Sequence, residues 1–187
     1  MRESLIKLFH RRWFAIALCI VCVITTTLLN TRVKLGGQCE ELIDRFYDTK
    51  SEEMSIGSQL QSICNAVTGL TAIAGHYSLD SSAANVANDY LQLGLKYSRE
   101  EAGTLHADYL EVLDAAEELI GRLEQAQLSK RDKENLTLYT EAIDIARSNI
   151  EASSYNVEVQ AFRRANIRFP AQLFAKIAGV EMPKVFQ

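Results

Sequence analysis

Proline is almost absent from this chain of 187 residues, which has only Pro170 and Pro183. Because proline removes a backbone donor and kinks helices, its absence before residue 170 allows long, uninterrupted helices. No stretch sustains the apolar–polar alternation of a half-buried strand. Apolar residues make up 48% of the chain, which is enough for a core and argues against disorder. The expected fold class is all-α.

The common catalytic motifs are also missing. The sequence has no G-x-S-x-G, no Walker phosphate loop and no H-E-x-x-H. Its acidic pairs, such as Glu52-Glu53 and Glu117-Glu118, are adjacent, so their carboxylates point to different sides of a helix rather than into one cleft. We therefore predict no enzyme, no catalytic residue and no cofactor.

Histidine is scarce, with only His10, His76 and His106. His76 lies at the end of one expected helix and His106 near the start of the next. They are weak candidates for a metal site, since they would meet only if the intervening residues folded back. The alternative is a surface or capping role, and no preformed metal site is predicted.

The four cysteines do not form a recognisable redox or metal motif. Cys19 and Cys22 have C-x-x-C spacing but lie inside an apolar run, where small apolar side chains serve packing. Cys39 and Cys64 lie further along, and their spacing leaves a disulfide or two free thiols open.

One apolar run is present, from Trp13 to Leu29, without a single charge. With a short polar fringe it predicts a transmembrane anchor over residues 13–31, since about 20 helical residues cross a bilayer core of about 30 Å. A basic segment, 1–12, precedes it. A cleaved signal peptide is the alternative, but the exit from the run offers no A-x-A cleavage pattern.

Cations on the two sides of the run predict its orientation. Four Lys or Arg residues precede it, whereas Arg32 and Lys34 follow it closely. The positive-inside rule then places the N-terminus in the cytoplasm and the helical bundle outside the cell. The anchor would cross the cell membrane once. No nucleic-acid partner is expected, because the basic run adjoins the apolar one and lacks interleaved aromatic residues.

Residues 32–187 are expected to form an antiparallel bundle of three to four long helices. Apolar residues there recur at alternating steps of four and three, which keeps them on one helix face. The stripes are Ile56, Leu60, Ile63, Val67, Leu70, Ala74 and Tyr77; Leu105, Tyr109, Val112, Ala116, Leu119, Leu123 and Ala126; and Leu136, Tyr139, Ile143, Ala146, Ile150, Ser153 and Val157.

Capping and helix-breaking residues set the expected limits of the helices. Gly36-Gly37 predicts a hinge after the anchor. Ser129 with Asp132 resembles a capping box before the third helix, which should end at Phe169-Pro170. A helix over 83–96 is a further possibility, and a short helix over 171–178 is expected to end at Gly179.

The run from Tyr155-Asn156 through Phe162 to Phe169-Pro170 resembles the C-terminal signature of the LemA family. Residues 59–76, which run to a histidine, resemble the first long helix of that family, and residues 113–123 its middle helix. The sequence departs from the family pattern in having Phe162-Arg163 where a second Tyr-Asn is usual. The chain is thus similar to a divergent member.

The resemblance implies a membrane-anchored helical bundle and brings no catalytic residues. Independently, Tyr155 and Phe162 are two turns apart, so they can form an aromatic ladder that continues to Phe169, with Asn156 satisfying a backbone group. This motif is either structural or partner-binding. The function that we expect is a non-catalytic interaction or scaffold module at the cell envelope, with a protein partner; the alternative is an extracytoplasmic ligand-sensing helical bundle.

Overall fold

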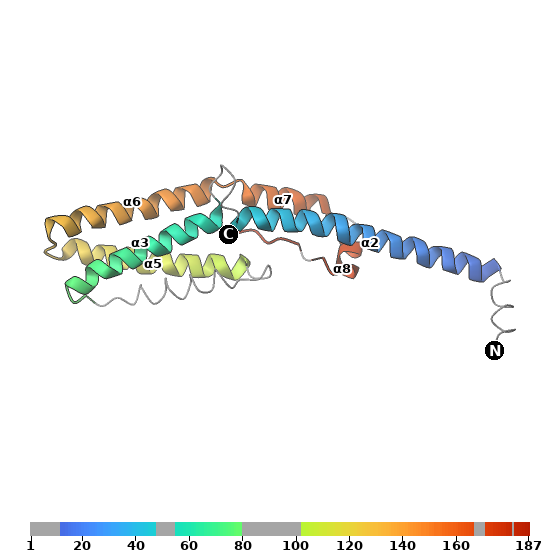
Figure 1. Cartoon of the computed structure of the whole chain (residues 1–187), viewed down its shortest axis with the longest axis horizontal. Helices are drawn as coiled ribbons and strands as arrows, with labels where there is room; N and C mark the ends of the chain where they lie inside the picture. The colour runs from blue at the N-terminus through green and yellow to red at the C-terminus, as the bar shows by residue number, and fades with distance from the viewer. Residues whose placement is uncertain (1–11, 48–54, 80–101, 167–170, 181) are drawn as a thin grey trace. The chain divides into compact units, whose positions relative to one another are not determined.

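The computed structural model describes residues 12–47, 55–79, 102–166, 171–180 and 182–187, and these residues contain helices and no strand. The all-α prediction is thereby confirmed. The chain divides into two compact units, and Figure 1 shows the helices that they contain. Unit 1 comprises Met1–Glu40 and Arg163–Met182, and unit 2 comprises Glu41–Phe162 and Pro183–Gln187.

The described helices follow one another in a simple order. They are α2 (Arg12–Tyr47), α3 (Ile56–His76), α5 (Ala102–Gln125), α6 (Lys130–Ala152), α7 (Tyr155–Asn166) and α8 (Ala171–Ile177). The expected helix over 83–96 and the residues Phe169 and Pro170 lie outside the described residues.

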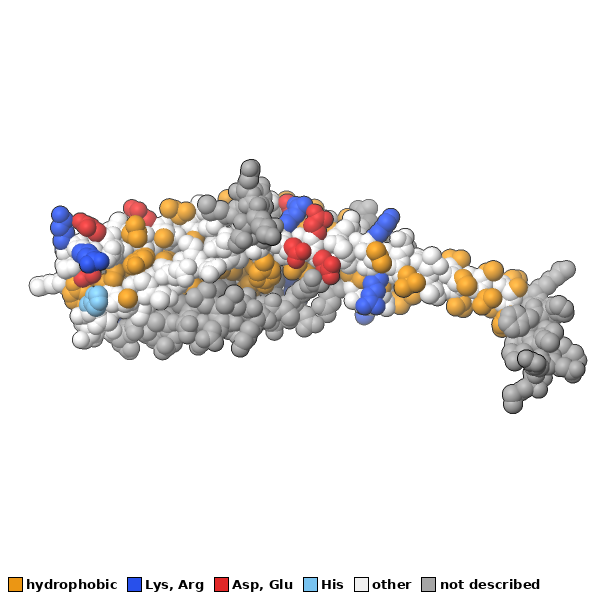
Figure 2. All heavy atoms as spheres, viewed as in Figure 1, with side chains coloured by type: hydrophobic (Ala, Val, Ile, Leu, Met, Phe, Trp, Pro, Cys, Tyr) orange, Lys and Arg blue, Asp and Glu red, His pale blue; other side chains and the backbone are white. Residues whose placement is uncertain are grey.

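Helix α2 is long and apolar enough to span a membrane. Its most apolar 18-residue window has a mean hydropathy of 2.1, and none of that window is buried within the protein. Figure 2 shows the apolar side chains along its surface. Thr25, Thr26, Thr27 and Thr31 each donate to the carbonyl four residues earlier at 2.8 Å, which satisfies their hydroxyls without water.

The hinge predicted at Gly36-Gly37 is wrong, because α2 continues through both glycines to Tyr47. Glycine costs only about 1 kcal/mol in a helix, and the flanking turns outweigh this cost. Neither glycine has an atom within 4 Å of the position that a Cβ would take, so close packing does not explain their presence.

Unit 2 has its core among α3, α5 and α6. Tyr77 at the end of α3 bonds Asp132 at the start of α6, whereas Asn149 near the end of α6 bonds Gln59 near the start of α3. These two helices are therefore antiparallel. The stripe residues Ile63, Val67 and Leu70 of α3 are at most 1% exposed.

The stripes of α3 and α5 are confirmed as core-facing, since all of their members are buried or half-buried. The bundle is antiparallel as expected, in that α3 and α5 both run opposite to α6, as Figure 1 shows. Helices α3 and α5 are therefore parallel to each other. Short connections favour antiparallel neighbours, whereas the connection between α3 and α5 is long and extends from residue 77 to residue 101.

The third predicted helix begins where expected, but the structure divides it into two helices, α6 and α7. Ser129 caps α6 by accepting from Asp132 N at 3.1 Å, which confirms the cap. The helix then ends at Ala152 because Ser153 adopts an extended conformation and its hydroxyl accepts from Tyr155 N at 3.3 Å. This serine thus starts α7 instead of continuing the stripe, and Val157 is 70% exposed.

In unit 1, the short helix α8 packs through Ala175, which is 3% exposed. Leu35 and Cys39 of α2 are the other buried apolar residues described in this unit. Gly179 has a φ of +66° immediately beyond α8, which confirms its predicted role as a C-terminal cap.

Candidate functional site

The start of α7 holds the C-terminal segment of the chain. Asn156 Nδ2 donates to the carbonyl of Phe186 at 2.8 Å, and Phe186 N donates to Asn156 Oδ1 at 2.7 Å. Tyr155 donates its hydroxyl proton to the carbonyl of Lys184 at 3.0 Å. The prediction that Asn156 satisfies a backbone group is confirmed, and it satisfies both backbone groups of one residue.

Phe186 fills an aromatic pocket in unit 2 and is 2% exposed. Its ring centroid lies 5.6 Å from that of Phe46, 5.5 Å from that of Tyr109 and 5.0 Å from that of His106. Such tilted and edge-on pairs are favourable beyond simple burial. We call Phe46, His106, Tyr109, Tyr155 and Asn156 the tail seat.

Burial raises the pKa values of the two tyrosines in the tail seat. Burial raises the pKa of Tyr155 to about 12, with Tyr47 adding to the effect. Burial also raises the pKa of Tyr109 above its ordinary value. Both phenols are therefore neutral at ordinary pH, so the Tyr155 hydroxyl keeps its proton and can donate it to a backbone carbonyl.

An ion pair connects α2 and α7 beside the tail seat. Arg45, in the last turn of α2, bonds Glu158 of α7 at 2.8 Å and Glu41 of its own helix at 2.9 Å. Arg45 is largely exposed, and such pairs contribute little to stability. The pair joins the last turn of α2 to the first turn of α7, close to the point where the ring centroids of Phe46 and Tyr155 are 5.1 Å apart.

The two histidine candidates are not brought together. His106 packs on Phe186 in the tail seat, close to the end of α6. His76 is exposed at the end of α3, beside the Tyr77–Asp132 bond at the opposite end of α6. The parallel course of α3 and α5 is the physical reason, because it separates the end of one helix from the start of the other.

The remaining candidate groups among the described residues are possible metal ligands and the cysteines. The part of the chain that the structure describes contains no cluster of three or more His, Cys, Asp or Glu residues suited to a metal. All four cysteines are free thiols, and burial raises the pKa of Cys64 to about 12, which suppresses its thiolate. The tail seat holds the C-terminal peptide segment around Phe186.

The structure describes only part of the LemA-like motif. Tyr155 is buried and Phe162 is half-buried on α7, while Phe169 and Pro170 lie outside the described residues. Sequence reasoning missed Phe46 and His106 as parts of the seat. No sequence spacing could have found them, because they come from two other helices and meet the chain end only in the folded protein.

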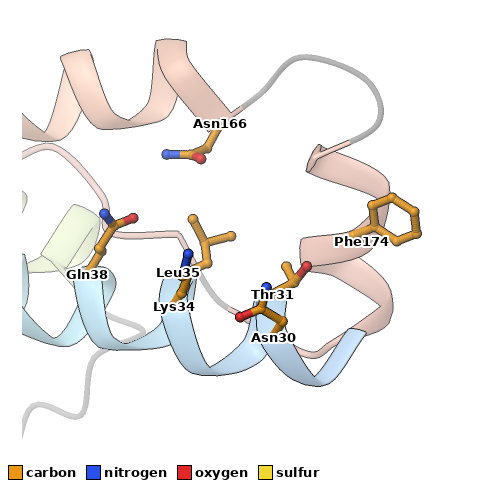
Figure 3. Close-up of a pocket in the computed structure, with 7 residues that line it drawn as sticks. All are labelled: Asn30, Thr31, Lys34, Leu35, Gln38, Asn166 and Phe174. Carbon is orange, nitrogen blue, oxygen red and sulfur yellow. The ribbon is translucent and has the colours of Figure 1, made fainter. Parts of the chain in front are cut away.

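A polar hollow of about 370 Å³ lies in unit 1, between α2, the end of α7 and α8 (Figure 3). Most of the described lining residues are polar, although apolar atoms form more of the surface of the hollow than polar atoms do, and Lys34 is the charged residue among those described. The lining residues are Asn30, Thr31, Lys34, Leu35, Gln38, Asn166 and Phe174. In Figure 3 the Phe174 ring lies beyond Asn30 and points away from Asn166 and Gln38.

No family model matches this chain, and comparisons with curated proteins and with solved structures return no significant match. A role is therefore inferred from the geometry of the two units.

Proposed function

We propose that this protein is a single-pass membrane protein of the LemA type, whose helical bundle binds a protein partner at the cell envelope and catalyses no reaction. The observation that carries the proposal is a packed bundle with apolar side chains left on the outside of one helix. Leu138 and Ile145 of α6 are each 61% exposed, seven residues apart on the side opposite the core.

The surface around these two residues favours a helical partner. Figure 2 shows apolar side chains on the surface over α6. Exposed Glu134 and Glu141 have the same heptad spacing and flank Leu138 and Ile145 on α6. An amphipathic helix with apolar residues every seventh position and basic flanks complements this face.

Membrane anchorage rests on α2, which is unburied over its apolar part. The four Lys or Arg residues in 1–12, against Arg32 and Lys34 beyond the span, support a cytoplasmic N-terminus with the bundle outside. The LemA assignment rests on Tyr155, Asn156 and Phe162, and the backbone pairing by Asn156 gives that motif a physical purpose.

Site-specific photo-crosslinking in native membranes tests the proposal. A photoreactive residue at position 145 is expected to give a discrete adduct with a second protein, and Leu138→Glu should abolish it. The matched controls are a photoreactive residue at the exposed position Ser148 and the substitution Thr137→Glu in the 145-labelled chain. Equal adducts at positions 145 and 148, or none at 145, would reject a partner on this face.

A further inference from the structure

Unit 1 has a charge opposite to that of the rest of the chain. Residues 1–40 and 163–182 contain ten Lys or Arg and three Asp or Glu, giving a net charge of +7. The residues of unit 2 have ten of the former and twenty-one of the latter, giving −11. Four of the ten cations precede the membrane span and belong to its cytoplasmic side. On the side of the bundle, residues 32–40 and 163–182 contain six Lys or Arg and two Asp or Glu, giving +4. An anionic bilayer surface therefore attracts this part of unit 1 and repels unit 2.

The place of α8 along α2 sets the depth of α8 relative to a membrane. The polar hollow joins Phe174 of α8 to Asn30 and Thr31, which directly follow the apolar run of α2. With that run in the hydrocarbon core, Asn30 and Thr31 lie at the level of the lipid headgroups. Helix α8, which packs at the same level, then lies in that layer too.

The exposed side chains of α8 suit this layer. Leu173 is 47% exposed and Ile177 is 59% exposed, one turn apart on one side of the helix. Ala175, on the other side, is buried. Lys176 is exposed beside them, which gives α8 the apolar and cationic surfaces of an interfacial helix.

We propose that α8 lies in the headgroup layer of the bilayer, with Leu173 and Ile177 among the upper acyl segments. Lys34, in the polar hollow, and Lys176 face anionic phospholipid headgroups. This inference rests on the proposed membrane anchorage by α2. It adds a second membrane contact, which α8 forms at the level where α2 leaves the membrane.

Depth-dependent fluorescence quenching of the full-length protein in vesicles tests this proposal. Trp13 is the single tryptophan, so it reports insertion of α2 in the native chain. The test chain combines Trp13→Phe with Ile177→Trp, in vesicles of phosphatidylcholine and phosphatidylglycerol with quenchers at known acyl positions. We expect blue-shifted emission that quenchers near the headgroups reduce more than quenchers near the chain ends.

Three controls make each outcome decisive. Leu173→Trp repeats the measurement should Ile177→Trp fail to fold, and Leu138→Trp on the bundle, equally exposed, should stay unquenched. Quenching of native Trp13 without quenching at 177 and 173 overturns the α8 proposal alone. Absence of quenching at Trp13 overturns the anchor and this proposal together.

The cationic part of the proposal has its own test in the same system. Phosphatidylcholine vesicles without phosphatidylglycerol should give weaker quenching at position 177, and Lys34→Gln with Lys176→Gln should remove the difference between the two lipids. Equal quenching of the native-charge chain in both lipids would overturn the contact with anionic headgroups.

Discussion

The ring of Tyr139 on α6 lies where a side chain at Gly69 of α3 would be. A Cβ added to Gly69 would be 2.6 Å from Cε2 and 2.7 Å from Cε1 of that ring, well inside van der Waals contact. The ring of Tyr139 therefore packs against the backbone of α3 at a position that only glycine fits. This contact fixes how α6 is seated on α3.

Gly69→Ala should destabilise the bundle by about 1–3 kcal/mol, because the ring must move out of a packed site. Gly75→Ala in the same helix is the matched control. It has open space around it and should be neutral or stabilising by about 0.5–1 kcal/mol through helix propensity alone. Chemical denaturation of the full-length protein in detergent measures both.

A second substitution separates the clash from other causes. In a Tyr139→Ala background, Gly69→Ala should no longer destabilise the fold, because the clashing atoms are gone. A cost that persists in this background would show that the ring of Tyr139 is not what excludes a side chain at position 69.

The paired bonds between Asn156 and Phe186 predict the effect of losing the amide. Asn156→Ala leaves both backbone groups of the largely buried Phe186 without their partner, which should cost about 1–3 kcal/mol of unfolding free energy. Val157→Ala, at the neighbouring exposed position, should change stability by less than about 0.5 kcal/mol.

Shortening the chain gives a stricter version of the same test. In a protein that ends at residue 182, the partner of Asn156 is absent, so Asn156→Ala should have little further effect. A full cost in the shortened protein would mean that Asn156 acts elsewhere than on the C-terminal segment.

Acid stability should depend on the cap at the start of α6. The hydroxyls of Tyr77 and then Ser129 bond Asp132 and hold the pKa of its carboxyl below the ordinary value of 3.8. An acid with a depressed pKa in the folded state stabilises the fold above its unfolded pKa. That contribution is lost as the pH falls from about 4 through the lower folded pKa.

Tyr77→Phe removes the first of these bonds, so the pKa of Asp132 should rise toward its ordinary value and the acid-dependent loss of stability should shrink. Carboxyl titration by nuclear magnetic resonance follows this directly. Tyr139→Phe, whose hydroxyl does not contribute to the Asp132 shift, should leave the titration unchanged. An unaltered Asp132 pKa in Tyr77→Phe would contradict the assigned cause.

The helical fold could be predicted from the sequence because its determinants are local. Stripe residues such as Val67 and Leu123 face the core as their spacing requires. The spacing of apolar residues does not reveal the break after Ala152, because Ser153 stands at a position where the heptad pattern continues. Its hydroxyl instead accepts a hydrogen bond from Tyr155 N and caps α7. Similarly, Gly36-Gly37 has the composition of a hinge, but the turns around it hold the helix together.

The candidate site could be predicted only in part. The Tyr155-Asn156 pair stands out in the sequence, but its partner Phe186 lies thirty residues away. Phe46 and His106 enter the same pocket from other helices. Their meeting depends on how α5 and α7 are placed, which local spacing does not encode.

The anchoring of the bundle by α2 is the claim on which the proposed role depends. Alkaline carbonate extraction of cell membranes, followed by mass measurement of the product, tests it most directly. We predict that the chain stays in the membrane pellet with residues 13–31 intact. A product released into the supernatant, or one cleaved after the apolar run, would contradict the claim.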